Sequence, residues 1–149
     1  MATQLKTLYV DSSALLALYL GEPTARSVRR ELEAGDNLVS HEITYTEMRT
    51  LLDRATRGQR LSAKERYRLL DAFERDWATL GVVASNPTLA RRARTLSNTW
   101  PLRRYDDIHL AAADCLARSV PEDSFALLTC DPPLQHAAEA FGLPVRAPH

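Results

Sequence analysis

The chain has 149 residues, of which 45% are hydrophobic and 26% are charged, and its formal net charge at neutral pH is zero. A chain of this length buries about 70% of the surface that it exposes when unfolded, so it can fold without disulfides or a structural metal. The zero net charge excludes a bulk attraction to nucleic acid or to a membrane, so any such partner must be bound by a local patch.

Short β-type runs alternate along the chain with longer segments of helical period. Strands are expected at residues 8–10, 38–39, 82–84 and 125–128, with a short fifth at 143–146. Helices are expected at residues 13–20, 24–34, 43–57, 62–79, 87–98, 105–119 and 133–141. This alternation predicts one α/β domain covering residues 1–149, with a mainly parallel sheet of four to five strands and helices on both faces.

The sequence also indicates where the protein resides. The apolar stretch of residues 14–20 is too short to span a membrane, and it lacks the basic lead and the small-residue cleavage site of a signal peptide. Cys115 and Cys130 form no CxxC motif. We therefore expect a cytoplasmic protein with two free thiols and no membrane partner.

Two acidic residues lie just after predicted strands. Asp11 ends the run "LYVD" and Asp131 ends the run "FALLTCD", and each precedes a predicted helix. Either could be a helix N-cap, because aspartate accepts hydrogen bonds from the free amides of a first turn. In parallel sheets, however, ligands bind beyond the carboxyl ends of the strands, so both residues are also candidates for a binding site.

Glu47 has an unusual place on the predicted helix 43–57. It falls inside the apolar arc of that helix, which is formed by Ile43, Met48, Leu51, Leu52 and Ala55. A buried carboxylate without a partner is costly, so we expect Glu47 to meet a cation, an arginine or a metal ion. The alternative is that Glu47 lies at the edge of the arc and extends to water.

The predicted helix 105–119 is apolar or small on most sides, yet it contains acidic residues. Asp106 and Asp107 lie at its start, where one of them could simply cap it, and Asp114 could make a hydrogen bond in the interior. His109 lies one turn after Asp106. We interpret it as a packing residue with satisfied hydrogen bonds, because no serine or cysteine pairs with it in a triad.

If Asp11, Glu47, Asp131 and one of the pair Asp106 and Asp107 converge, four carboxylates share one pocket and need a cation. Oxygen ligands without paired histidine or cysteine favour a hard divalent ion, Mg²⁺ or Mn²⁺, over zinc. Such an ion suits phosphodiester hydrolysis, because it lowers the pKa of a bound water and offsets charge on the phosphate. No general-base histidine is then needed.

Four stretches of the chain, in this order, match the pattern of one family. They are "LYVDSSALLALYL", "SHEITYTEMRTLL", "LRRYDDIHLAAA" and "LLTCDPPLQHAAEAFGL". Together they resemble the PIN-domain ribonucleases, in particular the VapC toxins of bacterial toxin–antitoxin pairs. The resemblance implies a metal-dependent endoribonuclease toxin that cleaves structured RNA such as tRNA, is silenced by a VapB-type antitoxin and commonly forms a homodimer.

The resemblance also implies site residues. It gives Asp11, Glu47, Asp106 and Asp131 the role of metal ligands and catalytic residues. Asp106 is favoured over Asp107 because the family's acid stands three residues before the histidine, here His109. Two hydroxyl residues match the family's supporting positions, and they are Ser13 and Thr129.

A nuclease with an acidic centre needs cationic flanks to hold a phosphate backbone. The favoured patch leads into Asp106 and comprises Arg91, Arg92, Arg94, Arg103 and Arg104, of which Arg91, Arg92, Arg103 and Arg104 are the predicted RNA contacts. A second patch comprises Arg54, Arg57, Arg60, Lys64, Arg66 and Arg68. Each patch could instead be a solvated helix face.

Other interpretations remain open. The apolar residues Leu15 to Leu20 either complete the core or offer a groove to an antitoxin helix, with Tyr19 as the exposed contact. A metal-dependent protein-binding module begins with DxSxS, of which Asp11 and Ser13 fit the first half, but Leu15 breaks the pattern. A catalytically silent PIN scaffold is the other alternative, although retention of all four acids argues against it.

Overall fold

The computed structural model describes residues 5–103 and 105–148. Its strands are β1 (Thr7–Val10), β2 (Asn37–His41), β3 (Gly81–Val83), β4 (Phe125–Leu128) and β5 (Val145–Arg146). Its helices are α1 (Ser12–Leu20), α2 (Ala25–Ala34), α3 (Ile43–Arg57), α4 (Ala63–Trp77), α5 (Pro87–Ser97), α6 (Asp106–Arg118) and α7 (Pro132–Phe141). These bounds differ from the predicted ones by at most three residues, and the predicted fifth strand is present.

All strand pairs are parallel, and the strand order is β3-β2-β1-β4-β5. The chain therefore proceeds outward from β1 to β3 and then returns to the other side of β1 for β4 and β5. The order reverses between β1 and β4, and a sheet of this type has its ligand crevice at such a reversal, beyond the carboxyl ends of the strands. Asp11 is the first residue after β1, and Asp131 is the third residue after β4.

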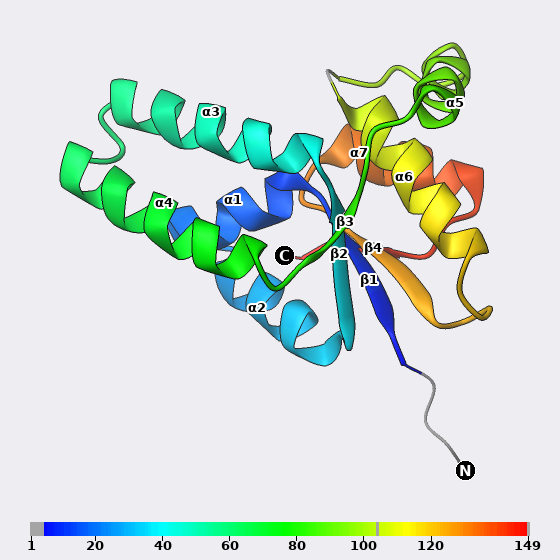
Figure 1. The fold of residues 1–149 in the computed structure, drawn as a ribbon, viewed down its shortest axis with the longest axis horizontal. Helices are drawn as coiled ribbons and strands as arrows, with labels where there is room; N and C mark the ends of the chain where they lie inside the picture. The colour runs from blue at the N-terminus through cyan, green and yellow to red at the C-terminus, as the bar shows by residue number, and fades with distance from the viewer. Residues whose placement is uncertain (1–4, 104, 149) are drawn as a thin grey trace.

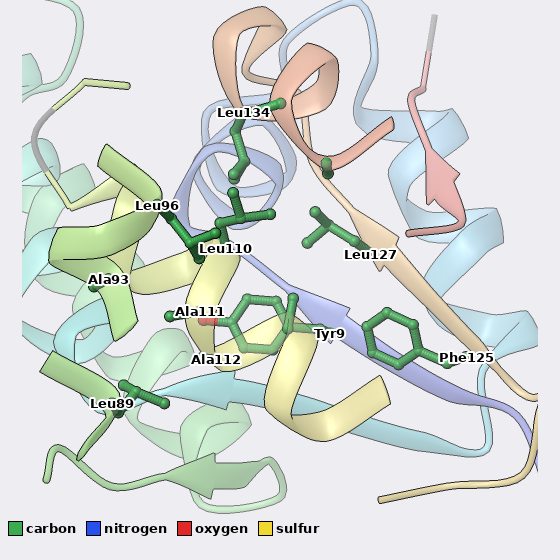
Figure 2. Close-up of a cluster of buried hydrophobic side chains, with 13 residues drawn as sticks. Tyr9, Leu89, Ala93, Leu96, Leu110, Ala111, Ala112, Phe125, Leu127 and Leu134 are labelled. Atoms are coloured by element: carbon green, nitrogen blue, oxygen red, sulfur yellow. The ribbon is translucent and has the colours of Figure 1, made fainter. Parts of the chain in front are cut away.

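The helices form two layers, one on each face of the sheet (Figure 1). Alternate residues of β1 serve the two layers: Leu8 and Val10 pack with α1 to α4, whereas Tyr9 packs with α5 to α7. Figure 2 shows Tyr9 among Leu110, Ala111 and Ala112 of α6, with Leu127 and Phe125 of β4 beside it. The predicted α/β class with helices on both faces is thus confirmed.

Local chemistry explains several helix ends. Ser62 and Glu65 form a capping box at the start of α4, and Asn86 caps α5, where Pro87 is the first helical residue. Gly21 and Gly142 end α1 and α7 with positive φ angles of 64° and 98°, which glycine adopts without strain. None of the helices in the described ranges combines the length and hydrophobicity that a membrane span requires.

Candidate active site

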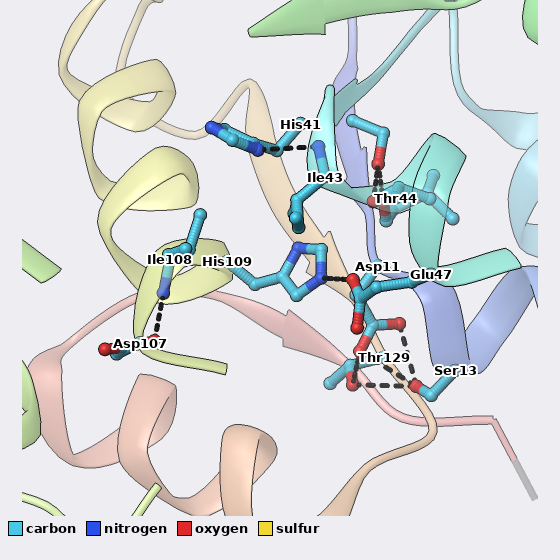
Figure 3. A network of polar contacts seen from close by, with 12 residues as sticks. Asp11, Ser13, His41, Ile43, Thr44, Glu47, Asp107, Ile108, His109 and Thr129 are labelled. Carbon is cyan, nitrogen blue, oxygen red and sulfur yellow. Dashed lines mark hydrogen bonds and ion pairs between the residues drawn. The ribbon is translucent and has the colours of Figure 1, made fainter. Parts of the chain in front are cut away.

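Asp11 is 1% exposed and is held by three neighbours. Its Oδ1 accepts a hydrogen bond from the Ala14 amide at 3.0 Å, so Asp11 does cap α1. Ser13 Oγ lies 2.8 Å from both carboxylate oxygens, and Thr129 Oγ1 donates to Oδ2 at 2.7 Å. Figure 3 shows these hydroxyls converging on the carboxylate. Cap and site candidate are therefore compatible roles for one residue.

The hydroxyl of Thr129 links Asp11 to Asp131. While it donates to Asp11, it accepts a bond from the Asp131 amide at 3.0 Å. The side chain of Asp131 makes no capping bond to α7, so the cap interpretation fails for this residue. Its carboxylate is 12% exposed and lies 3.7 Å from Arg103 Nη1.

Glu47 faces the interior as the apolar arc predicted, and its side chain is 15% exposed. Its Oε1 lies 2.7 Å from Nε2 of His109, a partner that the sequence did not predict (Figure 3). On the other side of the ring, His109 Nδ1 lies 2.7 Å from the Tyr9 hydroxyl. The interpretation of His109 as a satisfied packing residue is confirmed, and the ring also contacts a predicted site residue.

The two acids at the start of α6 point to different places. Asp106 is 8% exposed, and among the described residues its Oδ2 is buried without a hydrogen-bond partner. Asp107 turns away from the site: it accepts a bond from the Ile108 amide (Figure 3). It also accepts a bond from Ser97 Oγ. Asp114, also buried, pairs with Arg118 at 2.8 Å and with Arg92 at 3.7 Å.

The pKa of Asp106 shows that it lies close to the other three acids. Burial, a hydrogen bond and repulsion with Asp131, and repulsion from Asp11 and Glu47 raise the pKa of Asp106 to about 9. Burial also raises the pKa of Asp11, although His109 and the bonds from Thr129, Ala14 and Ser13 act in the opposite direction. The other three acids thus all lie close enough to act on Asp106.

The donor set fits a hard divalent cation, because it offers carboxylate oxygens, one of which is buried and without a partner. In the described part of the chain, the side chains form no ready-made group of three or more metal ligands. Two of the acids have cationic or polar neighbours instead: Glu47 Oε1 lies beside His109, and Asp131 lies beside Arg103. The residues that could hold the ion are Asp11, Glu47, Asp106 and Asp131.

Two buried residues of the site were not singled out from the sequence. Tyr9 is 0% exposed, and burial together with Asp11 and Glu47 raises the pKa of its phenol. His41 is 1% exposed, and its pKa is lowered by burial and by His109. Its Nδ1 accepts a bond from the Ile43 amide, whereas its Nε2 has no partner among the described residues. His41 could have been found from the sequence, because it is a polar residue at the end of a strand, as Asp11 is.

The predicted RNA contacts lie in different environments. Arg91 and Arg103 are exposed, whereas Arg92 pairs with Asp114 and lies over the Phe141 ring, 5.4 Å from its centroid. Arg104 lies outside the described residues. In the second patch, Arg60 pairs with Glu22 and Arg66 with Asp53. RNA contact by these residues stays a prediction.

Comparison with known proteins supplies the family. The PIN domain family matches residues 8–140. Ribonuclease VapC46 of Mycobacterium tuberculosis is 31% identical over 142 residues, which cover 95% of this chain and 97% of the relative. The chain is a PIN domain of the VapC family.

Solved PIN structures share the fold. VapC20 of M. tuberculosis, described as a sarcin-ricin loop cleaving toxin, aligns over 91% of this PIN domain and 95% of its own chain, with 18% identity and a TM-score of 0.64. A toxin–antitoxin complex from Klebsiella pneumoniae aligns over 95% of this domain and 98% of the matched chain, with 22% identity and a TM-score of 0.64. The resemblance inferred from the four sequence stretches is confirmed.

Proposed function

We propose that this VapC-family protein is a divalent-metal-dependent endoribonuclease, the toxin of a toxin–antitoxin pair, and that residues 1–149 act as a single PIN domain. The observation that carries the proposal is Asp106, whose Oδ2 is buried and has no hydrogen-bond partner among the described residues. Burial and three neighbouring carboxylates raise the pKa of this residue, and these neighbours are Asp131, Asp11 and Glu47. Membership of the VapC family supports it.

The residues have distinct tasks in this proposal. When bound, Mg²⁺ or Mn²⁺ supplies a water of lowered pKa and positive charge opposite the phosphate. Asp11 is held in one orientation by Ser13 and Thr129, so it offers a fixed ligand oxygen. Asp106 would hold the ion through its buried Oδ2, and the positive charge of the ion would oppose the burial and carboxylate repulsion that raise the pKa of this residue. Arg103 lies beside the acids, where it can bind a substrate phosphate.

The proposed partners are an RNA substrate, a VapB-type antitoxin and a second copy of this chain. An apolar groove of about 300 Å³ supports the antitoxin as a partner. It is lined by residues of α1, α2, β2 and α4, among them Leu15, Leu18, Leu32, Leu38 and Trp77. Tyr19 is half-buried there and donates to Asp76, so it is less exposed than the sequence predicted. α1 thus serves both the core and the groove.

Purified, antitoxin-free protein incubated with a mixed cellular RNA pool tests the proposed activity. We expect cleavage with Mg²⁺ or Mn²⁺, none with chelator and none by Asp11→Asn. Asp71→Asn is the matched control, because it removes one exposed carboxylate of α4 far along the chain from the acids. Cleavage that survives chelation or Asp11→Asn contradicts the proposal. Metal binding without cleavage of any RNA favours a protein-binding module or a silent scaffold.

A further inference from the structure

Three polar side chains from three elements form a chain through the core to the site. The Tyr9 hydroxyl of β1 lies 2.7 Å from His109 Nδ1 of α6, and His109 Nε2 lies 2.7 Å from Oε1 of Glu47 on α3. The exposed fractions are 0% for Tyr9, 1% for His109 and 15% for Glu47. Only the Glu47 end of this chain reaches solvent.

The acceptors along the chain determine where its protons lie. An ionised Glu47 can only accept, so His109 Nε2 must carry the hydrogen of that bond. A hydroxyl can donate to Nδ1 or accept from it, so the Tyr9 contact holds the ring in either protonation state. Both ring nitrogens are occupied, so the ring cannot flip without breaking both hydrogen bonds. Tyr9 thereby holds the ring in the orientation in which Nε2 faces Glu47.

The bond to His109 also gives the two carboxylate oxygens of Glu47 different surroundings. Oε1 accepts from the imidazole, and within the described residues no side chain donates to Oε2. A carboxylate on a flexible side chain presents an oxygen reliably only if its rotation is fixed by another bond. A phenylalanine and a leucine in place of Tyr9 and His109 would fill this core without any buried polar group.

We propose that Tyr9 and His109 are positioning residues: they fix the orientation of Glu47 and leave its second oxygen, Oε2, available to hold the metal ion. This inference rests on the proposed function, because it takes Glu47 as a ligand of that ion. His109 acts only through Glu47: it neither touches the ion nor transfers a proton in the reaction.

Mn²⁺ affinity of the RNA-free protein, measured by titration calorimetry or by electron paramagnetic resonance of free Mn²⁺, tests the proposal. His109→Leu removes the donor, and we expect about 10- to 100-fold weaker binding. His109→Gln restores an N–H donor at a similar reach, and we expect affinity close to wild type. Tyr9→Phe removes the bond that fixes the ring, and we expect a loss smaller than that of His109→Leu.

Val28→Ala is the matched control for lost stability. Val28 is fully buried on α2 in the opposite layer, so this variant should lower the melting temperature without changing Mn²⁺ affinity. A folded His109→Leu that binds Mn²⁺ as tightly as wild type overturns the proposal, and so does His109→Gln binding as weakly as His109→Leu. If His109→Leu does not fold, unchanged affinity in Tyr9→Phe overturns it.

Asp11→Asn separates this inference from the proposed function. If Asp11→Asn loses Mn²⁺ while the variants of His109 and Tyr9 keep it, the metal site stands and only the positioning role fails. If Asp11→Asn binds Mn²⁺ as wild type does, the metal site itself is wrong, and the positioning role fails with it.

Discussion

Two buried aspartates lie at the same edge of the sheet in opposite circumstances. Asp11, at the end of β1, has a bond from Ala14 and contacts with the hydroxyls of Ser13 and Thr129. Asp106, at the start of α6, has a buried oxygen without a partner in the described structure. The protein orients the first carboxylate by itself, whereas Oδ2 of the second has no partner in the described residues and is available to an added cation. One ligand is preorganised and the other responds to the ion.

The largest expected effect is common to both aspartates. Asp11→Asn and Asp106→Asn each remove a ligand charge, so we expect cleavage of RNA to fall by more than about a hundredfold, beyond the loss typical of supporting residues. Initial rates on a labelled RNA at saturating Mn²⁺ provide the measurement. If Asp106→Asn keeps near-wild-type activity, the comparison breaks, because Asp106 would then be a buried acid with no part in the reaction.

The next effect concerns the hydroxyls that only Asp11 has. Thr129→Val keeps the shape of the side chain but removes the donor to Asp11 and the acceptor for the Asp131 amide. We expect Mn²⁺ binding about tenfold weaker, because the orientation of two ligands is loosened. Titration calorimetry measures the Mn²⁺ affinity, and Thr95→Val, at an exposed position of α5, is the control. Unchanged affinity would mean that Asp11 does not depend on its hydroxyl neighbours.

A smaller effect, of opposite sign for the two residues, is expected in the metal-free protein. The folded pKa of Asp106 is about 9, so between about pH 4 and pH 9 the folded state holds a proton that the unfolded state has lost. Asp106 therefore lowers the stability of the fold progressively as the pH rises through this window, and it adds no such penalty below pH 4.

Thermal unfolding in chelator at pH 6 and pH 8.5 measures this effect. Asp106→Asn should flatten the fall in melting temperature and raise it at pH 8.5, by a few degrees. Asp11→Asn should lower the melting temperature at both pH values, because the amide nitrogen cannot accept the bonds that the carboxylate accepts. Two variants that shift stability in the same direction would remove the distinction between the two aspartates.

The smallest effect is expected at Asp107, the neighbour of Asp106 in the chain. Asp107 bonds the Ile108 amide and Ser97, away from the site. Asp107→Asn should therefore leave Mn²⁺ affinity and cleavage within about threefold of wild type and change stability by about 0.5 kcal/mol, as surface substitutions do. The same cleavage assay checks it. A loss as large as that of Asp106→Asn would show that the wrong acid of the pair has been assigned.

The sequence alone predicted the features that depend on a single helix or strand. Strand runs and helical periods predicted the layers, and the place of Asp11 and Asp131 after strands predicted a common edge, because parallel strands end together. The arc of α3 predicted that Glu47 faces inward. Asp106 and Asp107 could not be separated by periodicity, since both begin the same helix, and family resemblance was needed to favour one.

Contacts between elements were not predicted. His109 meets Glu47 across 62 positions of sequence, and this meeting depends on how α3 and α6 lie against each other. The contacts of Arg92 with Asp114 and Phe141 were not predicted either, because they depend on how α5 packs against α6 and α7. Tyr9 looked like an ordinary strand residue, because only the fold shows which polar group its hydroxyl reaches.

The pairing of β1 with β4 also affects the order of events during synthesis. β1 forms its ladder with a strand more than a hundred residues later in the chain, and Thr129 and Asp131 follow that strand. A nascent chain that has not yet extended past β4 thus lacks part of the acidic edge, however well its first helices have formed. Synthesis from the N-terminus therefore completes the acidic edge late, only after Asp131 has been added.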